Sequence, residues 1–370
     1  MTAQRVIALL GRRDEPTDAV EEYCRHLGAA LASHDLQLEI RRVGWNERGW
    51  PASLEALRLE AEAWRGTWVI VQYTALAWSA RGFPGRIARV FRLLRKAGAR
   101  IAIVFHDVEP FAGTRLVDRI RRRVQLGVMR DAAAFSDVNI FTIATDCISW
   151  LGDALPAKES LAIPVGANLP FPFEPQSHDE LHSPPVVGVF SITGGAAGDR
   201  ETRDVVRALR YASEKLGKLR LLVFGRHAEV RESVLRDGLR GSPVDLTVEG
   251  VVEGHTLVKR FADLDVLLFV RGTISSRRSS AIAGIACGLP VVGLRGRETA
   301  APITEAGVVL LPVELEETVL QSQLGDAIVS VLSNLSFRRE LALRSSAAQE
   351  KYFAWQAIAT RFADVLNKPK

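Results

Sequence analysis

The sequence predicts an α/β protein made of two similar halves, each built on a parallel sheet covered by helices on both faces. Throughout the 370 residues, short apolar runs alternate with amphipathic stretches of helical spacing, a pattern typical of buried parallel strands. A chain of this length is also long for one hydrophobic core. The alternation is interrupted before residue 186 and then starts again, so we expect two Rossmann-like domains.

The first half predicts a Rossmann-like domain over residues 1–170. A helix is expected at about 17–33, where Val20 and Leu27 fall at helical spacing, and another at about 85–97. The carboxyl ends of the strands should hold the ligand. The expected strands are 5–10, 36–43, 68–73, 100–106, 138–144 and 159–165.

Residues 171–185 are expected to form a linker, because five prolines lie between Pro170 and Pro185 without a hydrophobic period. A second Rossmann-like domain is expected over 186–350, facing the first across a cleft that is the default ligand site. Its expected strands are 186–192, 220–225, 246–250, 266–270, 290–294 and 307–312.

The last helix is expected at about 345–366, with an aromatic and apolar stripe. Either the stripe packs into an ordinary core, or the segment 351–370 crosses back to the N-terminal domain. The stripe consists of Tyr352, Trp355, Ile358 and Phe362.

Several classes of protein are not expected. No apolar run approaches the roughly 20 residues that span a bilayer, and the N-terminus lacks the features of a signal peptide, so we expect a cytoplasmic protein. Three cysteines, Cys24, Cys147 and Cys287, lie far apart and fit neither a disulfide framework nor a zinc site. No Asp-x-Asp motif follows a strand, so neither a metal nor a cofactor is expected.

The most informative stretch is FVRGTISSRRSSAIAGIACGLPVVGL, residues 269–294. A strand leads into a loop with four serines and two arginines, and a helix of small residues begins near Ser279. Free N–H groups and the dipole at a helix N-terminus favour an anion, and arginine suits phosphate. The alternative is a serine cap beside solvated arginines. The expected phosphate-binding residues are Ser275, Ser276, Arg277, Arg278, Ser279 and Ser280.

This stretch, followed by GVVLLP, resembles the donor-binding region of family 4 glycosyltransferases. VVGVFSITGG (186–195) is similar to the donor-phosphate loop of that family, and RLLVFGR (220–226) to the strand that follows. The resemblance implies a GT-B fold whose C-terminal domain binds a nucleotide-diphosphate sugar. Typical members carry two glutamates where this chain has Ser275 and Ala283, so a Ser-Ser-Arg-Arg-Ser-Ser loop replaces the paired-glutamate motif.

The chemistry of such a reaction requires a way to stabilise charge. Breaking a sugar–phosphate bond develops negative charge on a diphosphate, which arginines and backbone donors can stabilise without a metal. Besides Arg277 and Arg278, we expect Arg200, Arg226 and the Gly194–Gly195 turn to contact the donor. Surface positions are the alternative for Arg200 and Arg226.

The N-terminal half is expected to bind the acceptor. Asp14 and Asp18 follow the first strand and are expected to accept hydrogen bonds from sugar hydroxyls, although Asp18 also suits a helix N-terminus. Tyr73 ends the third strand and is a further acceptor-binding candidate. His106 and Asp107 end the fourth strand and are the candidate catalytic residues, with His106 acting as general base or binding the transferred sugar. A structural histidine is the alternative.

Positive charge is concentrated in residues 81–130, where 13 Arg or Lys face 3 acidic residues, a local net charge of +10. Within 114–130, Leu116, Ile120, Val124 and Val128 recur every four residues among arginines. Such a helix can lie on an anionic membrane at the inner face, or it can turn its stripe to the core. No nucleic-acid motif accompanies the charge, so nucleic acid is not an expected partner.

The sequence therefore predicts a metal-independent glycosyltransferase of bacterial polysaccharide or glycoconjugate synthesis. It should transfer a sugar from a nucleotide-sugar donor to a glycan, lipid-linked or small-molecule acceptor. Two alternatives stay open: a non-catalytic glycan-binding or partner subunit, and a sugar-nucleotide epimerase or hydrolase of the same fold.

Overall fold

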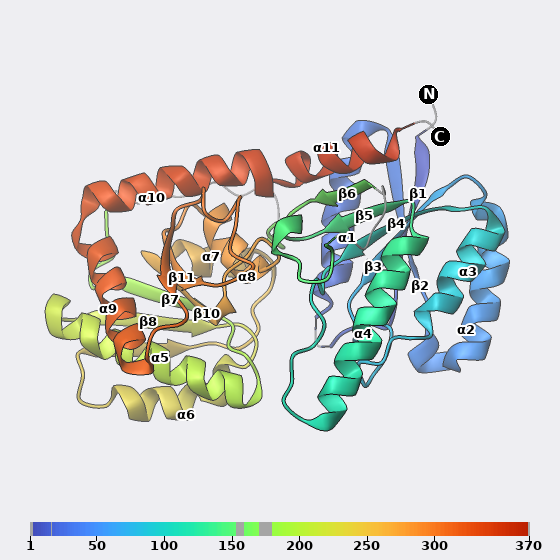
Figure 1. The fold of residues 1–370 in the computed structure, drawn as a ribbon. Helices are drawn as coiled ribbons and strands as arrows, with labels where there is room; N and C mark the ends of the chain where they lie inside the picture. The colour runs from blue at the N-terminus through green and yellow to red at the C-terminus, as the bar shows by residue number, and fades with distance from the viewer. Residues whose placement is uncertain (1–2, 16, 153–158, 170–179, 369–370) are drawn as a thin grey trace. The chain divides into compact units, whose positions relative to one another are not determined.

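The computed structural model describes residues 3–15, 17–152, 159–169 and 180–368, and it divides into two compact units (Figure 1). Unit 1 comprises Met1–Val165 and Trp355–Lys370, and unit 2 comprises Gly166–Ala354. Most of the expected linker, 171–179, lies outside the described residues.

Unit 1 is built on six parallel strands in the order β2-β1-β3-β4-β5-β6. Helices α2, α3 and α4 contribute side chains to the core on one face, while α1 and α11 pack against each other. The elements are β1 (Gln4–Leu10), α1 (Ala19–Leu31), β2 (Leu36–Arg42), α2 (Trp45–Ala61), β3 (Trp68–Tyr73), α3 (Ile87–Ala97), β4 (Arg100–Phe105), α4 (Leu116–Phe135), β5 (Val138–Phe141), β6 (Glu159–Ala162) and α11 (Trp355–Leu366).

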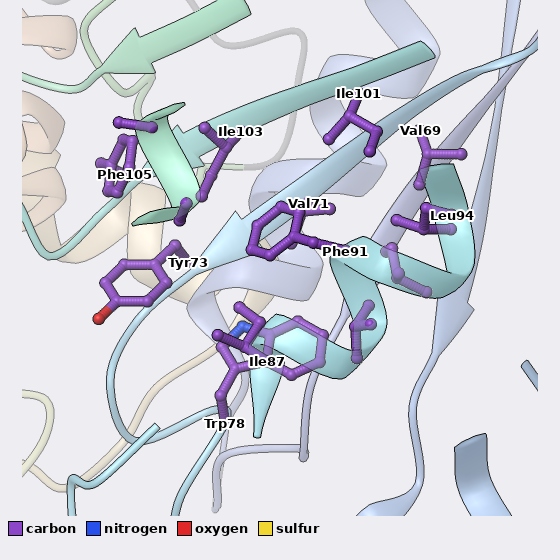
Figure 2. Close-up of a cluster of buried hydrophobic side chains, with 14 of the residues drawn as sticks. Val69, Val71, Tyr73, Trp78, Ile87, Phe91, Leu94, Ile101, Ile103 and Phe105 are labelled. Carbon is purple, nitrogen blue, oxygen red and sulfur yellow. The ribbon is translucent and has the colours of Figure 1, made fainter. Parts of the chain in front are cut away.

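The core of unit 1 shows why these segments form strands and a covering helix. Alternate side chains of β3 and β4, including Val71 and Ile103, point to one face, as the two-residue period of a strand requires. Helix α3 turns Ile87, Phe91 and Leu94 onto them (Figure 2). The result is a fully buried layer that holds the carboxyl ends of the strands rigidly in place.

Unit 2 repeats this architecture with a second sheet in the order β12-β11-β10-β7-β8-β9, again wholly parallel. The elements are β7 (Val186–Phe190), α5 (Gly195–Leu216), β8 (Leu219–Phe224), α6 (Ala228–Leu239), β9 (Val244–Val248), α7 (Gly254–Ala262), β10 (Val266–Thr273), α8 (Ser279–Ala286), β11 (Val291–Arg295), β12 (Val308–Pro312), α9 (Glu317–Ser333) and α10 (Leu335–Ala348).

The expected strands all form, and the two doubly wound sheets confirm the predicted α/β fold. The single helix predicted over 345–366 is wrong, because a π-helical turn at Gln349–Phe353 and an extended Ala354 separate α10 from α11. Trp355, Ile358 and Phe362 are buried in a helix that packs on α1.

Helix α4 also departs from one of its two predicted orientations. Its buried side chains are Asp118, Gln125 and Met129, with two alanines, whereas Leu116 and Ile120 are exposed. The alternative in which the whole 116–128 stripe faces the core is therefore wrong for its first two residues. Gln125 is buried because its amide hydrogen-bonds to the backbone of the preceding loops.

Candidate functional site

Each sheet has one point where the strand order reverses, and ligands of doubly wound folds bind beside that point. In unit 2 the reversal lies between β7 and β10. Strands β7 and β10 pair only at Val187–Gly188 with Val266–Leu267, so the segments that follow them are free to diverge. In unit 1 the reversal lies between β1 and β3.

A bulge in β10 shapes the site of unit 2. The strand pairs with β11 up to Phe269, opposite Gly293, and the next pair is Thr273 with Leu294. Residues 270–272 therefore bulge from the ladder, and Gly272 has a φ of +72°, a backbone conformation that favours glycine. Bulges commonly redirect a side chain beside an active site, and Arg271 is the charged residue of this bulge.

Arg271 and Arg278 form the electrostatic centre of this site. The Nε atom of each is buried and has no hydrogen-bond partner among the described residues. Burial lowers the pKa of Arg278 to about 10, and the charges of Arg277 and Arg271 add to the effect. Burial likewise lowers the pKa of Arg271, with a further contribution from Arg226. Two positive charges that are partly removed from water, repel each other and have unused N–H donors favour the binding of an anion.

Arg277, the neighbour of Arg278, has a carboxylate partner of its own. Its Nε and one terminal nitrogen donate to the two oxygens of Glu298 at 2.7 and 3.0 Å. Burial would raise the pKa of Glu298, but the hydrogen bonds and charge of Arg277 outweigh it and the pKa is lowered. The charge of Arg277 is therefore balanced within the protein, whereas Arg278 has no comparable partner in the described structure.

The loop carrying Glu298 is held in place by short contacts. The hydroxyl of Thr299 donates to the carbonyl of Ile274 at 2.6 Å and accepts from the N–H of Gly296 at 2.9 Å. A Cβ at Gly296 would lie 2.3 Å from the side chain of Thr273. This close packing requires glycine and fixes the carboxylate relative to the Ser275–Ser280 loop.

The serines of the loop divide into different roles. Ser275 is completely buried, and its hydroxyl donates to Glu298 at 3.3 Å. Ser276 and Ser280 are also buried. Ser279 is half-buried and is the first residue of α8. The predicted loop therefore contains Arg278 and lies close to Arg271. The hydroxyl of Ser275, however, is already hydrogen-bonded within the protein.

The turn after β7 forms a second wall of this site. Ser191 has a φ of +66°, and its hydroxyl accepts from the N–H of Arg226 at 3.2 Å, which ties the ends of β7 and β8 together. Gly194 caps α5 and Gly195 begins it, both exposed. Arg226 is half-buried, whereas Arg200 is exposed on α5.

A pocket of about 210 Å³ lies at the reversal point of unit 1. It is lined by the turn after β1, the start of α1 and the ends of β3 and β4. Gln72 is buried on its wall, and its Nε2 atom has no partner among the described residues. Its lining includes Gly11, Arg13, Asp14, Asp18, Gln72 and Asp107.

The predicted general base, His106, stands behind this pocket. Its Nε2 lies 2.8 Å from Oε1 of Gln72, and its ring meets Tyr23 edge-on at 5.1 Å. Burial lowers the pKa of His106 to about 4, so the ring is neutral at pH 7 and is a weak base. Its contacts suit a residue that orients the Gln72 amide toward the pocket.

The other predicted residues of unit 1 have mixed environments. Asp18 is buried and caps α1 through one oxygen, while the other accepts from Arg42 at 3.0 Å. Asp14 is exposed on the pocket wall. Asp107 accepts from the N–H of Ala75 at 2.7 Å. Tyr73 lies in the core (Figure 2), and burial, with the charge of Asp107, raises its pKa.

Among the described residues, no group of three or more His, Cys, Asp or Glu side chains could hold a metal ion. Within the same residues, no helix is both long and apolar enough to cross a bilayer.

No protein-family model matches the sequence, and no curated protein matches it. Several solved structures do match this chain. Anabaena Alr3699/HepE, crystallised with UDP and glucose, is 15% identical over 98% of this chain and 99% of its own, with a TM-score of 0.65. A glycosyltransferase from Rickettsia africae is 11% identical over 99% and 98%, with a TM-score of 0.68. A putative UDP-N-acetylglucosamine 2-epimerase from Listeria monocytogenes is 10% identical over 97% and 94%, with a TM-score of 0.60.

These likenesses extend over nearly the full length of each chain, and they define the class of fold. Two Rossmann-like units, each with a parallel six-stranded sheet, make this a GT-B fold.

Three residues of the two sites were not predicted from the sequence. Arg271 directly follows the expected strand 266–270 and was given no role, and only the following glycine hinted at a bulge. Glu298 lies in the next loop along the chain, 21 residues from Arg277. Gln72 is the penultimate residue of a buried strand, where a polar residue in an otherwise apolar run was the available signal.

Proposed function

We propose that this protein is a glycosyltransferase that transfers a sugar from a nucleoside-diphosphate sugar to a hydroxyl-bearing acceptor without a divalent metal. In this proposal unit 2 binds the donor and unit 1 binds the acceptor. The acceptor is a glycan, a lipid-linked sugar or a small molecule. The family 4 resemblance of residues 186–195 and 269–294 supports the same reaction.

The observation that carries the proposal is the pair of half-buried arginines, Arg271 and Arg278, whose Nε atoms are buried and have no hydrogen-bond partner among the described residues. A diphosphate leaving group gains negative charge as the sugar–phosphate bond breaks, and fixed cations in a desolvated site stabilise that charge. Burial destabilises the charged form of both side chains, and their pKa values are lowered for that reason. A bound diphosphate would offset this cost and would be held by fork-shaped hydrogen bonds.

The pocket of unit 1 supports the acceptor half of the proposal. The Nε2 group of Gln72 offers N–H donors on its wall, and Asp14 places a carboxylate at its exposed side. Sugar hydroxyls both donate and accept hydrogen bonds, so this combination suits them. We assign Gln72 to acceptor binding, and His106 to holding its amide rather than to proton abstraction.

An assay of donor consumption tests the proposal. The purified protein is incubated in EDTA with UDP-, GDP-, dTDP-, ADP- and CMP-linked sugars, with and without a lipid and glycan extract. We expect release of one nucleotide, and sugar transfer that depends on the extract. Arg278→Met should abolish both, whereas Arg240→Gln, an exposed arginine of unit 2, should change neither. Absence of nucleotide release from every donor would contradict the proposal.

A sugar-nucleotide epimerase is the second candidate, because a fold neighbour is a putative enzyme of that kind. Such chemistry needs carboxylates or other groups that move protons at the sugar. Two carboxylates near the arginines are engaged: Glu201 accepts from the N–H of Thr193 at 2.7 Å, and Glu298 pairs with Arg277. Formation of an epimeric nucleotide sugar without any acceptor would favour this candidate.

A further inference from the structure

Helix α4 begins with apolar side chains that no part of the described structure covers. Leu116 is 73% exposed and Ile120 is 49% exposed, and Val117 and the preceding Phe111 are exposed as well. The buried side of the same helix carries Asp118, Gln125 and Met129. By the 3.6-residue period, Leu116 and Ile120 lie opposite that side.

Arginines lie beside these apolar side chains. Arg119 and Arg123 are exposed, and the structure records no ion pair for them among the described residues. By contrast, the nearby Arg121 pairs with Asp118 and Arg95 pairs with Asp137. We call the set Phe111, Leu116, Val117, Arg119, Ile120 and Arg123 the α4 outer face.

The sequence around α4 is also strongly basic. The α4 outer face lies within residues 81–130, a segment of local net charge +10.

From this combination we infer that the α4 outer face docks on an anionic lipid surface. Leu116, Val117, Ile120 and Phe111 enter the boundary between headgroups and acyl chains, while the arginines contact lipid phosphates. The long arginine side chains can reach the headgroups while their stems cover apolar surface. This inference does not rest on the proposed function, because vesicle binding requires neither donor nor acceptor.

Other occupants fit the face less well. A second copy of the chain would oppose arginine to arginine across the contact, and like charges destabilise an interface. Nucleic acid would use the arginines but leaves the exposed leucine and isoleucine without a partner, since phosphate contacts are polar.

Co-sedimentation of the full chain with vesicles tests the inference. Vesicles of phosphatidylcholine alone are compared with vesicles containing about 30% phosphatidylglycerol, at low and high salt. We expect the anionic vesicles to bind at least about tenfold more tightly, and high salt to weaken the binding.

Two variants, each with a matched control, separate the contribution of the arginines from that of the apolar side chains. Arg119→Gln/Arg123→Gln should reduce binding at least about tenfold, whereas Arg203→Gln/Arg236→Gln removes the same charge from exposed helical positions of unit 2 and should not. Leu116→Ser/Ile120→Ser should reduce binding at least about threefold. Its control is Val230→Ser/Val234→Ser, at residues 72% and 49% exposed on α6.

Several results would overturn the inference. They are failure of the wild type to bind anionic vesicles, equal losses in variants and controls, or unchanged binding by Leu116→Ser/Ile120→Ser. A dimer in light scattering that this double variant abolishes, without vesicle binding, would assign the face to a second copy. Duplex RNA that displaces the protein from vesicles and binds it more tightly would assign the charge to nucleic acid.

Discussion

Replacing Arg278 by methionine should have opposite effects on ligand binding and on the stability of the unliganded protein. The pKa of Arg278 falls to about 10 in the folded chain, well below the ordinary range of a guanidinium, and one pKa unit corresponds to about 1.4 kcal/mol. The folded state thus holds this proton less tightly than the unfolded state. The penalty, roughly 3 kcal/mol, is present in full at neutral pH and is lost as the pH rises from about 10 toward the ordinary pKa of a guanidinium.

Arg278→Met removes that penalty, so the Tm of the unliganded protein should rise by at least about 3 °C. The same change deletes a charge-assisted donor worth about 1.5–3 kcal/mol, so the affinity for a nucleoside diphosphate should fall by roughly 10- to 150-fold. Differential scanning calorimetry with and without the nucleotide measures both quantities in one experiment.

Arg277→Met provides the contrasting control. Because Arg277 is paired with Glu298, its removal leaves a part-buried carboxylate without its partner and should lower the Tm. If Arg278→Met lowered the Tm as Arg277→Met does, or left nucleotide binding intact, Arg278 would not be the phosphate-binding arginine without a carboxylate partner, and its assignment would be refuted.

Three further predictions concern other parts of the chain. Because burial lowers the pKa of His106 from 6.5 to about 4, the unfolded state takes up its proton first. Stability should therefore fall by up to about 3 kcal/mol between pH 6.5 and pH 4, and chemical denaturation of His106→Asn should show a flatter profile. Gly198→Ala should destabilise unit 2 and weaken nucleotide binding, because its Cβ would lie 1.9 Å from the carbonyl oxygen of Thr193; Gly127→Ala, with nothing within 4 Å, should stabilise α4 by about 0.5–1 kcal/mol. Glu298→Gln should lower the free energy of unfolding by about 1–3 kcal/mol and therefore lower the Tm, and an unchanged Tm would show that its pair with Arg277 is not formed in solution.

The fold was predictable because it depends on a repeated, redundant signal. The run 266–270 is apolar at every position, and the run 68–73 is apolar except at Gln72, as expected of strands buried on both faces. Each is followed by a stretch of helical spacing, so the order of elements and the parallel sheets follow from local patterns.

The site was only partly predictable, because it depends on contacts between loops distant in the chain. The Ser275–Ser280 loop was recognisable from its composition, but the pairing of Arg277 with Glu298 depends on how the turn after β11 packs. Similarly, the bulge that aims Arg271 is a feature of strand register rather than of composition.

The break between α10 and α11 was missed for a related reason. Residues 345–366 contain no glycine or proline and include several alanines, so local propensity predicts one continuous helix. In the structure Ala354 is extended, and Trp355 packs on Tyr23 and His26 of α1 at 5.3 and 5.2 Å. Tertiary packing therefore overrides propensity at this position.

Binding of nucleoside diphosphates tests the central claim most directly. In EDTA, the Tm of the wild type and of Arg278→Met is followed against UDP, GDP, dTDP, ADP and CMP. A ligand that binds only the folded state raises the Tm by mass action. The account predicts that one diphosphate raises the Tm of the wild type and that the shift is lost in Arg278→Met. A folded wild type whose Tm no nucleotide changes would contradict it.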